Sequence, residues 1–173
     1  ADWLKEHRSL DGETASVLAR VSGGSMGRAI DLFDGGFLEI REKWISRIAD
    51  LPGLPKDEAF QAAVSWAAEA KTLGVITEPG RFGSLDVLSI WASYYRDLLL
   101  LAAGGSERLL MNIDFCTRLQ NTAKALSMES LIQGLLAIDS AHRDLRRMRN
   151  VSVVMGRMVI ALNRLAAGNG GTQ

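Results

Sequence analysis

Cysteine and histidine are scarce in this 173-residue sequence, and their scarcity excludes several kinds of site. Cys116 is the only cysteine, so it has no partner for an intramolecular disulfide and no companions for a thiolate metal site. His7 and His142 are the only histidines, and neither has a second ligand at helical spacing. We therefore predict no metal site and no cofactor. His142 lies on an apolar stripe between Ile138 and Leu145, which is typical of a core or interface residue.

Net charge and long hydrophobic runs are absent as well. Lys+Arg and Asp+Glu number 20 each, so the chain as a whole has no long-range attraction for nucleic acid or anionic lipid. The longest aliphatic run, 98–103, is far shorter than the roughly 20 apolar residues that span a bilayer, and no charged-then-apolar signal segment opens the chain. These features predict a cytoplasmic protein without a membrane segment.

No residue pattern predicts catalysis. Cys116 lacks a flanking pattern that would supply a base, so a buried thiol is the expectation. Two acidic pairs stand at predicted helix ends, where carboxylates usually serve solvation or the helix dipole. These pairs are Asp31 with Asp34, and Asp57 with Glu58. We predict no catalytic residue and no enzyme activity.

Apolar residues recur at helical spacing along the whole chain, which predicts an all-α fold. Three short elements come first, each too short to be stable alone. Asp11 and Ser25 are predicted N-caps, and Gly23-Gly24 separates the second element from the third. The three elements are predicted at 1–7, 11–22 and 25–33.

The pair Gly35-Gly36 marks the predicted boundary between this small subdomain and a larger helical bundle. Within the small subdomain, one stripe of the third element is predicted to pack on Leu18 and Val21 of the second; the stripe comprises Met26, Ala29, Ile30 and Phe33. The bundle helices are predicted at 37–50, at 57–73, after a loop at 74–83, at 114–126, and after the caps Ser84, Ser127 and Asn150.

Two bundle helices have broad apolar faces. The helix after Ser84 is a strong candidate for the core, and the last helix has a seam that could close the bundle or meet a neighbouring subunit. The tail 168–173 has too little apolar content to order itself. The apolar positions are Val87, Leu88, Trp91, Tyr94, Tyr95, Leu98 and Leu101 in the first of these helices, and Val151, Met155, Met158, Leu162 and Leu165 in the last.

A basic cluster ends the helix that Ser127 opens. It could contact phosphate or an acidic partner subunit. Cations near a helix carboxyl end also complement the helix dipole, and this ordinary interpretation is the favoured one. The cluster comprises Arg143, Arg146, Arg147 and Arg149.

Three passages resemble one protein family. Residues 19–32 (ARVSGGSMGRAIDL) look like the lid passage of clamp-loader subunits of the AAA+ family. Residues 91–101 (WASYYRDLLLL), followed by 110–114 (LMNID), are similar to the central helix and following segment of bacterial delta-prime collar domains. The stretch from Arg149-Asn150 through 153–165 resembles the final collar helix. The order and spacing of the passages agree over nearly the whole chain.

The resemblance implies a three-helix AAA+ lid at 1–35, a helical collar or oligomerisation domain at 36–167 and a disordered tail at 168–173. Such collars join gamma/tau, delta and delta-prime subunits of DNA polymerase III into the pentameric ring that loads the sliding clamp in DNA replication. DNA and the clamp would be contacted only indirectly. The chain opens without an initiator Met or a cap, so we expect a fragment whose nucleotide-binding P-loop lies upstream.

One departure from the family pattern favours the delta-prime branch. In subunits that hydrolyse ATP, a sensing arginine stands three residues before the segment aligned with residues 30–32, and here that position is Gly27. Arg28 follows, about 100° further around the helix. By this resemblance, Ser25 and Arg28 are nucleotide-proximal lid residues without a catalytic role, and Gly35-Gly36 is a candidate hinge.

Three alternatives stay open. The chain could be the corresponding region of the ATP-hydrolysing gamma/tau subunit. It could be an independent helical adaptor or DNA-binding module with 25–33 as recognition helix. Arg28 is the only cationic residue of that segment, however, and the acidic Asp31 and Asp34 outnumber it. An enzyme built on a helical bundle is disfavoured because no Glu-x-x-His constellation is present.

Overall fold

The computed structural model describes residue 3 and the ranges 10–74 and 83–168, and these residues form helices and turns without any strand. The all-α prediction is confirmed. The helix predicted at 1–7 lies outside the described residues except for Trp3, as do most of the loop predicted at 74–83 and most of the tail predicted at 168–173.

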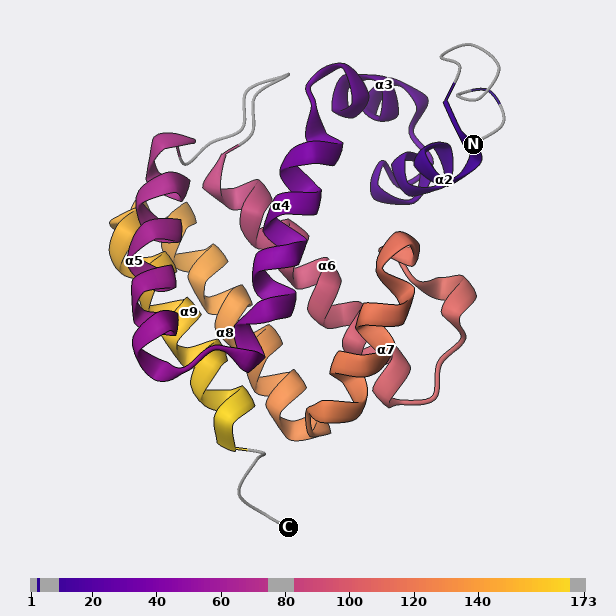
Figure 1. Cartoon of the computed structure of the whole chain (residues 1–173). Helices are drawn as coiled ribbons and strands as arrows, with labels where there is room; N and C mark the ends of the chain where they lie inside the picture. The colour runs from indigo at the N-terminus through magenta and orange to yellow at the C-terminus, as the bar shows by residue number, and fades with distance from the viewer. Residues whose placement is uncertain (1–2, 4–9, 75–82, 169–173) are drawn as a thin grey trace.

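The first two labelled helices, α2 (Gly12–Val21) and α3 (Met26–Asp34), lie together at one end of the molecule (Figure 1). Asp11 caps α2 by accepting hydrogen bonds from two backbone amides, and Ser25 caps α3, as predicted. Gly23 and Gly24 between the helices both adopt positive φ, which a side chain would disfavour.

A small hydrophobic cluster joins α2 to α3. Its buried members are Ala15 and Leu18 of α2 and Ala29 of α3. Met26, which the helical pattern also assigned to this contact, is 45% exposed instead. Met26 is the first residue of α3, and the buried contact with α2 is made one turn later by Ala29.

The remaining helices build a bundle in which α5 packs along α9, and α8 packs on both α6 and α9 (Figure 1). Short 3₁₀ segments occupy Leu51–Gly53, Glu107–Leu109 and Ile113–Phe115. The bundle helices are α4 (Phe37–Asp50), α5 (Lys56–Thr72), α6 (Ser84–Ala102), α7 (Cys116–Ala125), α8 (Met128–Arg146) and α9 (Val151–Ala167).

Three tryptophans form the centre of the bundle core. Trp91 of α6 is fully buried, and its ring meets those of Trp44 and Trp66 edge to face at centroid distances of 5.6 and 6.1 Å. The indole nitrogen of Trp91 donates to the carbonyl of Trp44 at 2.8 Å, so its polar atom is satisfied. The predicted apolar face of α6 is therefore confirmed as core, with Leu101 at its end only half-buried.

One predicted cap is wrong. Ser84 is the first residue of α6, and its hydroxyl donates to the carbonyl of Gly74 at 2.9 Å. Gly83 holds the cap position, and its amide donates to the Asp86 carboxylate at 2.9 Å. Ser127 and Asn150, by contrast, cap α8 and α9 as predicted, each accepting a hydrogen bond from a backbone amide.

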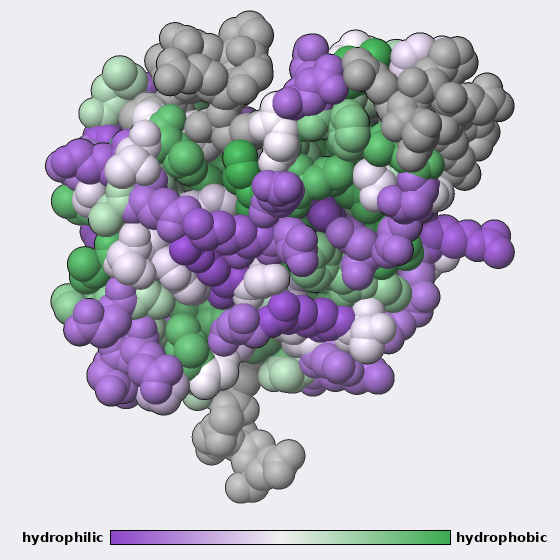
Figure 2. Space-filling view, turned by 45° about the horizontal axis from the view of Figure 1, so that its top comes forward, coloured by the Kyte–Doolittle hydropathy of each residue, from purple (hydrophilic) through white to green (hydrophobic). Residues whose placement is uncertain are grey.

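The surface carries both hydrophilic and apolar side chains. Figure 2 shows hydrophilic residues spread across one face, with smaller hydrophobic patches between them. Within the described ranges, none of the helices combines the length and the apolar character needed to traverse a bilayer.

Two helical glycines, Gly134 in α8 and Gly156 in α9, test how tightly these two helices pack on their neighbours. A methyl group added at Gly134 would overlap the ring of Tyr95, whereas one added at Gly156 would have the carbonyl oxygen of Ala63 as nearest neighbour at 4.0 Å. We expect Gly134→Ala to destabilise the fold by about 1–3 kcal/mol through overpacking. Gly156→Ala should stabilise it by roughly 0.5–1 kcal/mol through helix propensity. Urea unfolding of both variants checks the sign, and equal effects would contradict this packing.

Candidate functional site

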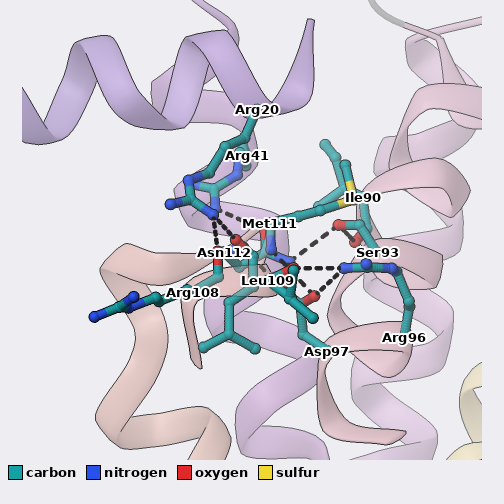
Figure 3. Close-up of polar contacts among 11 residues, drawn as sticks. Arg20, Arg41, Ile90, Ser93, Arg96, Asp97, Arg108, Leu109, Met111 and Asn112 are labelled. Atoms are coloured by element: carbon teal, nitrogen blue, oxygen red, sulfur yellow. Dashed lines mark hydrogen bonds and ion pairs between the residues drawn. The ribbon is translucent and has the colours of Figure 1, made fainter. Parts of the chain in front are cut away.

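The most extensive buried polar feature of the bundle centres on Asp97 of α6, whose side chain is fully buried (Figure 3). Its carboxylate accepts hydrogen bonds from the backbone amides of Met111 and Asn112 at 3.1 and 2.8 Å. The Asn112 side-chain amide donates to it at 2.9 Å, and Arg96 pairs with it at 2.8 Å. A carboxylate can remain buried only with such partners, so Asp97 fixes the path of the chain just after the 3₁₀ segment Glu107–Leu109.

Asn112 connects Asp97 of α6 to Arg41 of α4. It is fully buried, and its side-chain oxygen accepts from Arg41 at 2.6 Å, while its amide also donates to Ser93 at 3.2 Å. Arg41 is 3% exposed and donates to both oxygens of Asp114 at 2.7 and 2.9 Å. The guanidinium also lies over the ring of Phe115 at 5.4 Å. Arg41 thus holds two residues of one short segment in place.

Arg20 of α2 reaches the same segment from the small subdomain. Its guanidinium donates to the backbone carbonyls of Arg108 and Leu110 at 2.9 and 2.6 Å. The arginine therefore ties α2 directly to the segment that Asp97 and Arg41 fix. We call the set Arg20, Arg41, Asp97, Asn112 and Asp114 the polar network.

The polar network positions helices and does not supply reactive groups. Each carboxylate is paired with an arginine, and the buried Asn112 has both its oxygen and its nitrogen in hydrogen bonds. In this arrangement the acids are held as acceptors for fixed donors. The structural role of the polar network is to join α2, α4, α6 and the segment before α7.

Of the two predicted lid residues, the structure places Arg28 beside this network. Ser25 accepts from the amide of Arg28 at 3.4 Å, and Arg28 borders a cleft of about 180 Å³ between α3, α4 and α6. Arg41, Asp86 and Met111 line the same cleft. Arg28 is exposed and borders this cleft of its own chain. The nucleotide-proximal role of Ser25 and Arg28 stays a prediction.

The candidate hinge has a bent backbone. Gly36 adopts φ 70° and precedes α4, and Gly35 ends α3 with an ordinary negative φ. A pivot at this junction would separate Arg20 from the two carbonyls that it binds, so these two hydrogen bonds oppose the motion. The hinge stays a prediction.

Arg20 gives a direct test of this restraint. We expect Arg20→Ala to raise the amide hydrogen exchange rates of α2 and α3 by about tenfold or more, because two charge-assisted bonds are lost. Exchange in α6, α8 and α9 should be unchanged. Arg28→Ala is the matched control, and hydrogen exchange mass spectrometry gives the readout. Equal protection in wild type and Arg20→Ala would show that Arg20 does not hold the subdomain.

The basic cluster at the end of α8 is exposed, and two of its four arginines form ion pairs. Arg143 pairs with Asp139 at 3.3 Å and Arg149 with Asp144 at 3.2 Å. Arg146 and Arg147 are exposed, with Arg147 at the carboxyl end of the helix. The turn that follows contains Met148 with a positive φ of 58°.

Cys116 and His142 show no activation for chemistry. Burial and the nearby Glu107 raise the pKa of the Cys116 thiol, which favours the less reactive protonated form. Burial and Arg146 lower the pKa of His142, against the opposite effect of Asp139. No group of acidic, cysteine and histidine side chains in the described part of the chain is arranged to hold a metal ion.

Comparison of the chain with protein-family models, with curated proteins and with solved structures found no match. The residues and their geometry are therefore the basis for any functional proposal.

Sequence reasoning missed Arg41 and Asp97 as members of a site. The signal for Arg41 was its place on the buried stripe of α4, four residues after Phe37 and three before Trp44. Asp97 lies three residues after the buried Tyr94 and directly before the buried Leu98. A charged residue on a core stripe indicates a buried pair, but the sequence gives no way to identify its partner.

Proposed function

We propose that this chain is the lid and collar region of a delta-prime-type subunit of the bacterial DNA polymerase III clamp loader. In this role it assembles with gamma/tau and delta subunits into the pentameric ring that loads the sliding clamp. The chain acts by assembly and has no catalytic role of its own.

One observation carries the proposal. Two of the three passages on which the family resemblance depends contribute to the polar network, namely 19–32 and the pair of segments 91–101 and 110–114. Arg20 comes from the first passage, and Asp97 and Asn112 come from the two segments of the second. Residues of these two passages are distant in sequence and meet in space, which gives one physical reason for the two passages to occur together.

The arrangement suits an assembly role. Hydrophobic burial around Trp91 makes the bundle a rigid body, and the polar network fixes the α2–α3 pair to it through Arg20. Apolar side chains remain exposed on helices that the core does not cover, including Phe60 and Val64 of α5 and Leu136 of α8, each more than half exposed. Residual apolar faces of this kind fit contacts in a heterologous ring.

Reconstitution tests the proposal. The purified chain is mixed with gamma/tau and delta subunits from the same bacterium, and the mixture is separated by size exclusion. We expect the chain to elute with the other subunits at a larger size than when it is alone. Circular dichroism of the same preparation establishes that the chain is folded. Separate elution of a folded chain would reject the proposed function.

A further inference from the structure

The outer face of α8 and α9 contains a groove with a mixed lining. The two helices run antiparallel and are joined by the short turn 147–150, and Ser130 near the start of α8 donates to the carbonyl of Leu165 near the end of α9. The groove has a volume of about 170 Å³. Its lining comprises Ala137, Ser140, Ala141 and Asp144 of α8 and Val154, Arg157, Met158 and Ala161 of α9.

Large apolar side chains are exposed next to the groove residues. Leu136, one helical turn before the lining residue Ser140, is 51% exposed, and Val153, one turn before the lining residue Arg157, is 55% exposed. Met148 in the connecting turn is 70% exposed. Apolar area left in water on adjoining helices is typical of a protein contact surface.

The same region concentrates positive charge. Residues 139–168 contain six arginines and only two acidic residues, although the chain as a whole is neutral. Both acidic residues, Asp139 and Asp144, are already paired with arginines. Among the described residues, no carboxylate pairs with the remaining arginines. These arginines are Arg146, Arg147, Arg157 and Arg164.

We propose that the α8–α9 groove docks an acidic amphipathic helix of a neighbouring clamp-loader subunit. This inference rests on the proposed function and specifies the surface and the chemistry of the partner. A helix places apolar side chains every three or four residues, which matches a groove between two helices. Carboxylates beside that apolar stripe would meet Arg157 and the basic end of α8. The exposed Leu136 and Val153 favour a protein occupant, because nucleic-acid backbones offer no apolar counterpart to them.

Two variants test charge and shape separately. Arg157→Glu reverses the charge that lines the groove, and Ser140→Trp places a bulky side chain in it from an exposed position. Lys56→Glu, at the exposed start of α5, is the control for a charge reversal elsewhere. Binding to a purified complex of gamma/tau and delta subunits is measured for each at low and high salt. We expect about tenfold or greater loss of affinity for both groove variants, little change for the control, and weaker wild-type binding at high salt.

The outcomes separate the inference from the proposed function. If wild type binds the complex and both groove variants bind equally well, the groove is not the docking site although the assembly role stands. If folded wild type binds none of the subunits, the proposed function fails and the inference fails with it. Binding of wild type to a short duplex DNA that Arg157→Glu abolishes would overturn the choice of a protein helix as occupant.

Discussion

Replacing Asp97 by alanine is expected to lower the free energy of unfolding by about 3–5 kcal/mol, because several buried donors lose their acceptor at roughly 1–3 kcal/mol each. The substitution leaves the amides of Met111 and Asn112 without the acceptor that the carboxylate supplies. It also leaves the Asn112 side chain with one fewer bond in a site that water does not reach. Urea unfolding followed by circular dichroism measures the loss.

An exposed carboxylate provides the control for this prediction. Asp139 is 58% exposed and pairs with Arg143 one helical turn away. Asp139→Ala should therefore change the free energy of unfolding by no more than about 0.5 kcal/mol. A loss of similar small size in Asp97→Ala would contradict the view that Asp97 anchors the 110–114 segment. Asp97→Asn keeps the size of the side chain and should fall between wild type and alanine.

The second large effect is expected for Arg41→Ala, at about 3 kcal/mol. The side chain is 3% exposed. Its removal leaves the Asn112 oxygen without a buried donor and Asp114 without its bidentate partner. Arg41→Lys retains the charge but not the planar pair of donors, and should recover only part of the loss. Arg118→Ala removes an arginine that pairs with Asp50 at the surface and is the matched control.

Combining the two substitutions tests whether they act through one network. Asp97 and Arg41 do not bond to each other, and both hold Asn112. Their effects should therefore fall short of additivity by roughly 0.5–3 kcal/mol in a double-mutant cycle. Strict additivity would mean that α4 and α6 are stabilised independently and that Asn112 does not connect them.

Local signals in the sequence predicted the helices well. The caps Asp11, Ser25, Ser127 and Asn150 were identifiable because each is a short polar side chain just ahead of a helical apolar pattern. The buried face of α6 followed from spacing alone. Each of these features depends on residues within a few positions of one another.

Features that depend on distant residues were not predictable in the same way. Arg41 binds residues 71 and 73 positions away, and Arg20 binds carbonyls 88 and 90 positions away. Helical periodicity says nothing about such pairings, since they are set by how the helices pack. The exposure of Met26 was misjudged for the same reason, because a stripe on one helix does not show where its partner helix ends.

Two local details of helix ends were also not predictable from the sequence pattern. Met148 ends α8 in the left-handed conformation that glycine usually provides, and the sequence offers no glycine there. Ser84 resembled a cap, yet its hydroxyl reaches the carbonyl of Gly74 while Gly83 takes the cap position. Several residue types satisfy the same local geometry, so the tertiary contact decides between them.

Native mass spectrometry of the reconstituted mixture tests assembly, the central claim, most directly. The 18.8 kDa chain is mixed with gamma/tau and delta subunits and sprayed from a volatile buffer. We expect a complex whose mass includes a single copy of this chain together with both other subunit types. A spectrum that shows the folded chain free at its own mass, while the other subunits associate without it, would contradict the proposed function.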